Sequence, residues 1–534
     1  MSTATESQPK SSSLEADLTS GFLVFLIALP LCLGIAMASG FPPVAGVITA
    51  IVGGVLVSFI GSARLTIKGP AAGLIVIAIG AVTELGQGDM VAGYRRALAV
   101  GVVAGIVQIV FALTRAGALG EVFPPSVVHG MLAAIGVIIV SKQAHTVLGV
   151  VPAAKEPLHL IAEIPKSISE LNPEIALIGI ISLAVLYGLP LFKNKWMKKV
   201  PAPLVVLLVT VPLGLAFALD HAHTYSFNHH AFNVGPQHLV SLPGSLIKAV
   251  ATPDFSMVTS AVSIKYVVMF ALVGTVESLL SVSAVDALDP EKRASDLNKD
   301  LLATGIGNTI AAAVGGLPMI SEIVRSKANI DAGAKSRMSN FFHGGFLLLF
   351  VALVPGLLHR IPLAALGAML VYTGTRLASP SEFVRAYKVG PEQLLLFLTT
   401  FVVTLATDLL VGVGVGLLLK LVLHLKNGAP IKSLFRVVID EQRAGDVLLL
   451  KVHDAAIFTN LLGLKKRLDK LDDGVKKVVV DFGDTWVVDH TVFERLHAIE
   501  REWPDRELEI VGLDGHVPSS SHAFASRRRP RAAA

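Results

Sequence analysis

Residues 315–339, GGLPMISEIVRSKANIDAGAKSRMS, place Glu322, Arg325 and Lys327 inside a chain that is otherwise almost continuously apolar. Charge at membrane depth is costly and marks a functional site. Gly-Gly-Leu-Pro is a poor start for a continuous helix, so the stretch predicts an extended segment and then a short helix from about Ile320. The first amides of such a helix have no intrahelical partner and its dipole is positive there, which predicts an anion site. Arg325 adds a full positive charge. A surface loop with its charges in water is the alternative.

The composition is that of a polytopic membrane protein. Of the 534 residues, 53% are hydrophobic and only 16% are charged, and the mean hydropathy is +0.67, far from soluble domains. The single cysteine, Cys32, excludes internal disulfides and cysteine zinc clusters, and it reads as a small core residue. No nucleophile, metal cluster or cofactor motif stands out, so the sequence predicts neither an enzyme nor a nucleic-acid partner.

Fourteen apolar segments precede residue 427, and most are long enough to cross about 30 Å of hydrocarbon. They lie near 20–38, 44–60, 70–83, 95–113, 126–147, 174–191, 201–219, 266–284, 298–314, 320–331, 339–356, 361–375, 391–407 and 410–426. The third and tenth are too short to span, and they open with Gly69-Pro70-Ala71-Ala72-Gly73 and after Gly316-Leu317-Pro318. Paired interrupted segments point to a transporter's binding site, and their spacing fits a seven-plus-seven inverted repeat.

A second feature of the membrane segments is a set of oxygen-bearing side chains. Glu277 and Ser281 are four residues apart, so on a helix they share one face and can bind one small cation such as sodium. Alternatively, Glu277 or Glu322 carries a proton. Glu322 and Arg325 could instead neutralise each other as a static pair. Lys68 either adds positive field to the anion site or faces the cytoplasm, and Asp408 is expected to cap the last helix.

The chain divides into four predicted regions. Residues 1–16 form a cytoplasmic tail without signal-peptide character, 17–428 the transporter domain, 432–515 a small α/β domain, and 516–534 a disordered basic tail. Lys and Arg gather in connections such as 193–199, which places both termini in the cytoplasm. The histidines between 221 and 238 match no zinc spacing and favour a solvated or pH-sensitive loop over a metal site.

The region after Lys426 has its own pattern. Strand-like runs at 446–452, 475–482 and 508–513 alternate with an amphipathic helix at 460–470, which predicts a compact α/β layer domain. Asp489-His490-Thr491 has no second carboxylate or nucleophile nearby, so regulation or dimer contact is the expected role.

Several short motifs together resemble the SulP family of anion transporters, and the terminal domain resembles the STAS domain of that family. The motifs are Leu29-Pro30, Gly40-Phe41-Pro42-Pro43-Val44-Ala45-Gly46, Gly69-Pro70-Ala71-Ala72-Gly73, Glu277-Ser278-Leu279-Leu280-Ser281, Gly315-Gly316-Leu317-Pro318, Arg325-Ser326 and Ala332-Gly333-Ala334-Lys335. The resemblance covers roughly residues 15 to 515. It implies fourteen transmembrane segments arranged as core and gate domains of the UraA-like kind, with the core moving against the gate.

The resemblance also implies the site residues. The anion is expected between the starts of the third and tenth segments, at Ala71, Ala72, Gly73, Glu322, Ile323, Val324 and Arg325. The cation positions of sodium-coupled members correspond to Glu277, Ser281, Ser321 and Glu322, with Glu277 and Ser281 as the metal ligands. Ile323 lacks the hydroxyl of those members, whereas Glu322 adds a carboxylate, as in proton-coupled uracil transporters.

The implied function is secondary active transport of a small inorganic anion across a bacterial inner membrane. The chain resembles the bacterial branch of the family whose members are often encoded beside, or fused to, carbonic anhydrase. This resemblance implies bicarbonate before sulfate as the substrate and carbonic anhydrase as a candidate partner. The family also implies a homodimer with contacts through the STAS-like domain. The alternatives are a proton-coupled sulfate or dicarboxylate transporter, a passive anion channel or exchanger, a nucleobase:proton symporter, and a membrane sensor or scaffold.

Overall fold

The structure, a computed structural model, describes residues 10–118, 123–154, 156–192, 200–241, 249–472, 474–503 and 505–530. The chain forms two compact units, Met1–Gly117 with Ile135–Leu377 and Ala118–Ala134 with Ala378–Ala534. The helix α7 (Pro125–Leu148) contributes to both. The predicted division at residues 428–432 stays a prediction; within the second unit, Ala378–Ala534 contains the last membrane helices together with the terminal domain.

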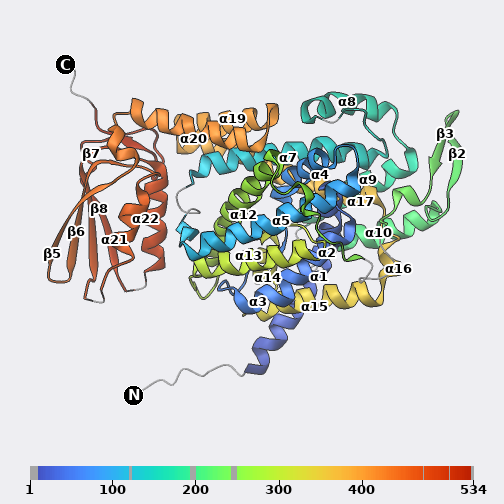
Figure 1. Cartoon of the computed structure of the whole chain (residues 1–534), viewed down its shortest axis with the longest axis horizontal. Helices are drawn as coiled ribbons and strands as arrows, with labels where there is room; N and C mark the ends of the chain where they lie inside the picture. The colour runs from blue at the N-terminus through green and yellow to red at the C-terminus, as the bar shows by residue number, and fades with distance from the viewer. Residues whose placement is uncertain are drawn as a thin grey trace. The chain divides into compact units, whose positions relative to one another are not determined.

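The first unit is built from helices (Figure 1). They are α1 (Lys10–Ala38), α2 (Pro43–Ile51), the π-helical turn η1 (Val52–Leu56), α3 (Val57–Ile60), α4 (Ile75–Gly86), α5 (Met90–Leu113), α8 (Pro157–Ser169), α9 (Pro173–Gly188), α10 (Ala202–Ala216), α12 (Ala261–Leu288), α13 (Leu297–Ala313), α14 (Ile323–Asp331), α15 (Met338–Leu353), α16 (Pro355–Leu358) and α17 (Leu363–Leu377). Because α1 begins at Lys10, the predicted tail 1–16 is already helical over its last residues.

The predicted membrane class is confirmed. Among the described residues, seven helices are long and apolar enough to cross a bilayer, and four shorter apolar helices accompany them. Each of the fourteen predicted segments contains a described helix. The lysines at 193–199 that supported the orientation lie outside the described residues.

The third and tenth segments cross each other as two short antiparallel strands, β1 (Lys68–Pro70) and β4 (Met319–Ser321). Lys68 pairs with Ser321, Gly69 with Ile320 and Pro70 with Met319. Beyond the crossing, a 3-10 turn at Ala72–Leu74 leads into α4, and α14 begins at Ile323. The predicted start near Ile320 is wrong because that residue is held in the strand pair.

Glycines let the surrounding helices approach closely. A Cβ added at Gly54 would lie 2.5 Å from the Cα of Gly344 on α15, and one added at Gly105 of α5 would lie 2.7 Å from the Thr309 backbone nitrogen of α13. Real Cβ atoms do not approach that closely, so only glycine fits at these two positions. The close packing makes a rigid frame around the strand crossing.

The histidine-rich connection, predicted as a solvated or pH-sensitive loop, is a mostly exposed hairpin of β2 (His223–Phe227) and β3 (His230–Val234). His223 pairs with Val234 and Phe227 with His230 across it. No group of three or more potential metal ligands occurs among the described residues.

In the second unit, three helices precede a six-stranded sheet (Figure 1). The helices are α18 (Pro380–Val389), α19 (Pro391–Ala406) and α20 (Leu409–Lys426), and the sheet contains β5 (Val438–Ala444), β6 (Val447–Ala456), β7 (Lys477–Val488), β8 (Glu507–Val511), β9 (Val517–Pro518) and β10 (Arg527–Arg528), with α21 (Leu461–Leu468) and α22 (His490–Glu502) packed on it. Strands β6, β7 and β8 are parallel neighbours, as the α/β prediction requires. Asp408 caps α20 as predicted, since its carboxylate accepts the Val411 amide at 2.9 Å.

The tail prediction is wrong for the described residues 516–530. Arg527 and Arg528 pair with Val488 and Val487 of β7 on one side and with β9 on the other. Residues 531–534 lie outside the described residues.

A buried ion pair joins α20 to the terminal domain within this unit. The Lys420 ammonium lies 3.0 Å from the Asp489 carboxylate, both side chains are almost fully buried, and His424 stands 3.5 Å from the same carboxylate. Burial alone would raise the pKa of Asp489, but Lys420 and His424 hold it well below its usual value. The pair therefore stabilises the folded unit at neutral pH, and this contribution is lost only as the pH falls through that depressed pKa.

We expect Lys420→Met to destabilise this unit by about 3–5 kcal/mol, because it leaves the Asp489 carboxylate buried without its partner. Thermal unfolding of the full chain in detergent measures the effect. Lys426→Met, at the exposed last residue of the same helix, is the matched control. Asp489→Asn added to Lys420→Met should recover much of the loss, and an unchanged unfolding temperature for Lys420→Met would refute the role of the pair.

Candidate functional site

Two helix starts face one another beyond the strand crossing. Ala71 and Gly73 are buried, and the Ala72 amide at the start of the third segment's helix faces the Glu322 carboxylate, which precedes α14. The side chains of Ile323 and Val324, by contrast, are 41% and 48% exposed. The structure thus brings the predicted anion residues of both segments together, with backbone amides as the available donors.

Arg325 lies behind these helix starts rather than at their exposed face. Its side chain is 1% exposed, its guanidinium packs against Gly69 of β1, and its Nη1 lies 3.6 Å from the Cys32 Sγ of α1. Its Nε has no hydrogen-bond partner in the part of the chain that the structure describes. The Arg325 charge does act on the Glu322 carboxylate, so the static-pair alternative stays a prediction.

His343 of α15 was not predicted as part of this site. It is fully buried, and neither ring nitrogen has a hydrogen-bond partner among the described residues. It also lies within electrostatic reach of Arg325. No sequence signal could have found it, because a lone histidine in an apolar segment is usually a core residue.

The two predicted coupling carboxylates do come together. The Glu277 carboxylate of α12 lies against Gly73, where any side chain would displace it, and it interacts electrostatically with Glu322. Glu277 Oε2 and Glu322 Oε1 are both buried without a hydrogen-bond partner in the described chain. Two neighbouring carboxylates repel each other when both are charged, and a cation or a proton between them would relieve that repulsion.

The two serines predicted for the cation site differ in their surroundings. Ser281 is 8% exposed on the same helix as Glu277. Ser321 instead receives the Lys68 ammonium at 2.6 Å, and its amide donates to Ser278 Oγ at 3.2 Å. The Ser321 hydroxyl is therefore engaged away from the carboxylate pair.

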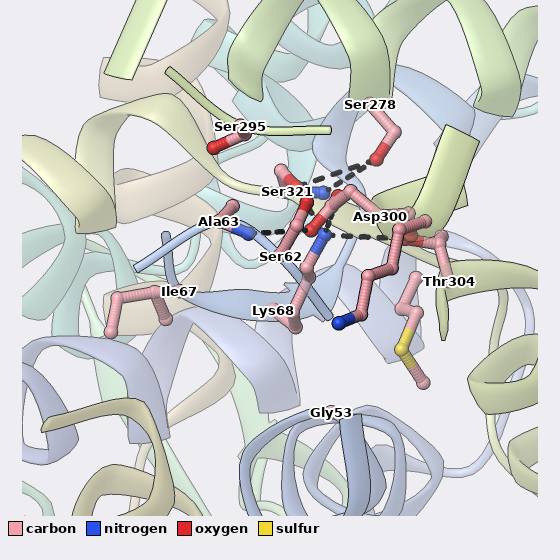
Figure 2. Close-up of polar contacts among 12 residues, drawn as sticks. Gly53, Ser62, Ala63, Ile67, Lys68, Ser278, Ser295, Asp300, Thr304 and Ser321 are labelled. Carbon is pink, nitrogen blue, oxygen red and sulfur yellow. Dashed lines mark hydrogen bonds and ion pairs between the residues drawn. The ribbon is translucent and has the colours of Figure 1, made fainter. Parts of the chain in front are cut away.

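Lys68 is buried and so does not face the cytoplasm, and its ammonium is paired with the Asp300 carboxylate. Figure 2 shows its side chain directed at Asp300 and Thr304 of α13 and at Ser321 of β4. Asp300 was missed as the partner of Lys68, although an aspartate in an apolar segment is a signal that could have found it.

An apolar multi-helix frame and two helix starts facing a buried charge define a membrane transporter rather than an enzyme. The Sulfate permease family matches residues 14–400 of the chain. The chain belongs to this family, which is the SulP family of the sequence resemblance.

Relatives agree with this assignment. The putative sulfate transporter YvdB of Bacillus subtilis is 28% identical over 77% of this chain and 74% of its own length. The bicarbonate transporter BicA of Picosynechococcus is 24% identical over 95% of this chain and 90% of its own.

Solved structures share the fold. The transmembrane domain of a cyanobacterium bicarbonate transporter BicA matches with a TM-score of 0.62 at 24% identity, covering 75% of this chain and 97% of that one. The overall structure of SLC26A9 matches with a TM-score of 0.68 at 13% identity, covering 97% and 86%. The second comparison extends the shared fold into the terminal domain.

Proposed function

We propose that this chain is a secondary active transporter of a small inorganic anion, bicarbonate before sulfate, driven by sodium, with protons as the alternative coupling ion. The anion binds between the helix starts at Ala71–Gly73 and at 322–325, and transport proceeds by movement of the core domain against the gate domain. One observation carries the proposal. The amide end of one half-helix, the start of the other and the buried Arg325 converge near Glu277 and Glu322, each of which has one carboxylate oxygen without a hydrogen-bond partner in the described residues.

The Glu322 carboxylate explains why a cation is needed. It faces the Ala72 amide, which is one of the donors that an incoming anion would use. An anion would therefore meet a fixed negative charge unless Glu322 and Glu277 were neutralised. A sodium ion held by Glu277, Glu322 and Ser281, or a proton on one carboxylate, provides that neutralisation, so cation and anion move in the same direction.

The chemistry at the helix starts favours a singly charged anion. Ile323 and Val324 contribute apolar side chains, so direct donors are limited to backbone amides and the nearby guanidinium of Arg325. Sulfate carries two charges and needs more donors to replace its water. The relatives include a protein named as a sulfate transporter and one named as a bicarbonate transporter, so they support a small inorganic anion as the substrate. The preference for bicarbonate over sulfate rests on the small number of donors at the helix starts.

We place the protein in a bacterial cytoplasmic membrane with both termini inside, as the Lys and Arg of the connections indicate. We also propose a homodimer with contacts through the STAS-like terminal domain, and carbonic anhydrase as a supplier or consumer of the transported bicarbonate.

Purified protein in liposomes tests the function. Labelled bicarbonate, sulfate and a dicarboxylate are offered under a sodium gradient, a proton gradient or neither, with empty liposomes as the control. We expect bicarbonate to accumulate under an inward sodium gradient at least tenfold above the level without a gradient. Flux that equilibrates without accumulation under any gradient would indicate a passive channel, and accumulation of sulfate alone would overturn the bicarbonate assignment.

A further inference from the structure

Beside the strand crossing, the ammonium group of a lysine is surrounded by side-chain oxygen atoms. The Lys68 ammonium contacts the Asp300 carboxylate, the Ser321 hydroxyl at 2.6 Å and the Thr304 hydroxyl at 3.2 Å (Figure 2). The side chains of Lys68 and Asp300 are 3% and 1% exposed. An ammonium has three N–H donors, and here all three find oxygen acceptors.

The acceptors come from two elements, α13 and β4, and their hydroxyl groups are themselves held in place. Thr304 donates its hydroxyl hydrogen to the Asp300 backbone carbonyl at 2.9 Å, which leaves its oxygen free to accept from Lys68. Ser278 Oγ of α12 lies 3.4 Å from Ser321 Oγ and accepts the Ser321 amide at 3.2 Å. One carboxylate and two hydroxyls form an oxygen cage of the kind that suits a small hard cation.

The cage also positions the anion site. Lys68 is the first residue of β1 and pairs with Ser321, the last residue of β4, so its ammonium ties both strands to α13. Its backbone amide is fixed as well, donating to Asn340 Oδ1 at 3.3 Å. The helix starts at Ala72 and Ile323 follow within a few residues, so their placement depends on this tie.

We propose that Lys68 is a built-in cation, occupying an oxygen cage formed by Asp300, Thr304 and Ser321 that would otherwise bind a free monovalent cation. This goes beyond the proposed function, because the cage is distinct from the Glu277 and Glu322 coupling site. The protein thereby keeps the crossing neutralised throughout transport. A free ion would occupy the cage only by binding from solution and could dissociate again. The Lys68 ammonium is attached to the chain, so occupying the cage requires only that its side chain become ordered.

The test removes the tethered cation and offers a free one. Lys68→Ala leaves Asp300 and two hydroxyls around a space that small cations can enter. Thermal unfolding and anion uptake are measured in N-methylglucamine, potassium, sodium and methylammonium chlorides. We expect both to fall in N-methylglucamine, uptake by at least tenfold, and both to recover saturably with methylammonium or an alkali cation. Wild-type stability should not respond to methylammonium.

Two variants control the result. Lys299→Ala removes an exposed lysine next to Asp300 and should behave as wild type in every salt. Lys68→Ala combined with Asp300→Asn lacks the carboxylate and should lose the cation response. A folded Lys68→Ala protein that matches wild type in N-methylglucamine, or that responds to no cation, overturns the proposal.

If Lys68→Ala cannot be purified, the Asp300→Asn variant tests the proposal by itself. It preserves the volume but leaves the ammonium without its carboxylate, so unfolding temperature and uptake should both fall and no added cation should restore them. Wild-type values for this variant overturn the proposal. The methylammonium effect on unfolding is read without any flux, so its failure is distinguishable from failure of the transport assignment.

Discussion

Replacing Arg325 by alanine is expected to raise the half-saturating anion concentration about tenfold to a hundredfold while the protein still inserts and unfolds cooperatively. Arg325 supplies the full positive charge behind the two helix starts, and its Nε is unpartnered among the described residues. An interaction with a charged partner contributes about 1.5–3 kcal/mol, which corresponds to that range of affinity. Concentration-dependent uptake into liposomes measures the change.

The neighbouring lysine provides the control. Lys327 lies on the same short helix, but it is exposed and pairs with Asp331 at 3.1 Å, so Lys327→Ala should keep wild-type affinity. Arg325→Lys keeps the charge and should retain part of the affinity. If Arg325→Ala takes up anion with wild-type affinity, the anion does not bind at these helix starts.

The local parts of this site could be predicted from the sequence because they depend on local chemistry. Gly-Pro and Gly-Gly-Leu-Pro break two apolar segments, and a broken helix inside a membrane leaves its first amides free. The exact start of α14 could not be predicted, because Met319–Ser321 is held by pairing with Lys68–Pro70, far away in the chain.

The same reason explains the contacts that were missed. Lys68 and Asp300 are 232 residues apart in the sequence, and nothing in either local sequence indicates that they are in contact. Ser321 looked available to the carboxylate pair from its position alone, but the side chain is already used by Lys68. Such long-range contacts depend on how helices pack.

The terminal region shows how composition misleads at the end of a chain. The run Arg527–Arg531 with its flanking small residues has the composition of a solvated tail, yet Arg527 and Arg528 pair with β7. The backbone amides and carbonyls of β7 supply the partners, and backbone pairing does not require apolar side chains.

The second large effect is expected on ion coupling at Glu277 and Glu322. Glu277 Oε2 and Glu322 Oε1 both lack a hydrogen-bond partner among the described residues. With sodium as the coupling ion, the negative charge of Glu277 is itself a ligand. With a proton, the neutral form of the carboxyl is the state that accompanies the anion. A glutamine at 277 is neutral and nearly the same size, so it separates these cases.

We expect Glu277→Gln to abolish sodium-driven accumulation of anion, because the amide cannot replace the charge that binds sodium beside Ser281. If protons are the coupling ion, the glutamine imitates the protonated state, and exchange of anion for anion should survive while gradient-driven accumulation is lost. Uptake is therefore measured both as accumulation under each gradient and as exchange at equilibrium. Glu84→Gln is the matched control, since Glu84 pairs with Lys265 at 2.8 Å outside the site and its loss should leave coupling intact. Accumulation by Glu277→Gln equal to wild type, with unchanged dependence on sodium and pH, would remove Glu277 from coupling.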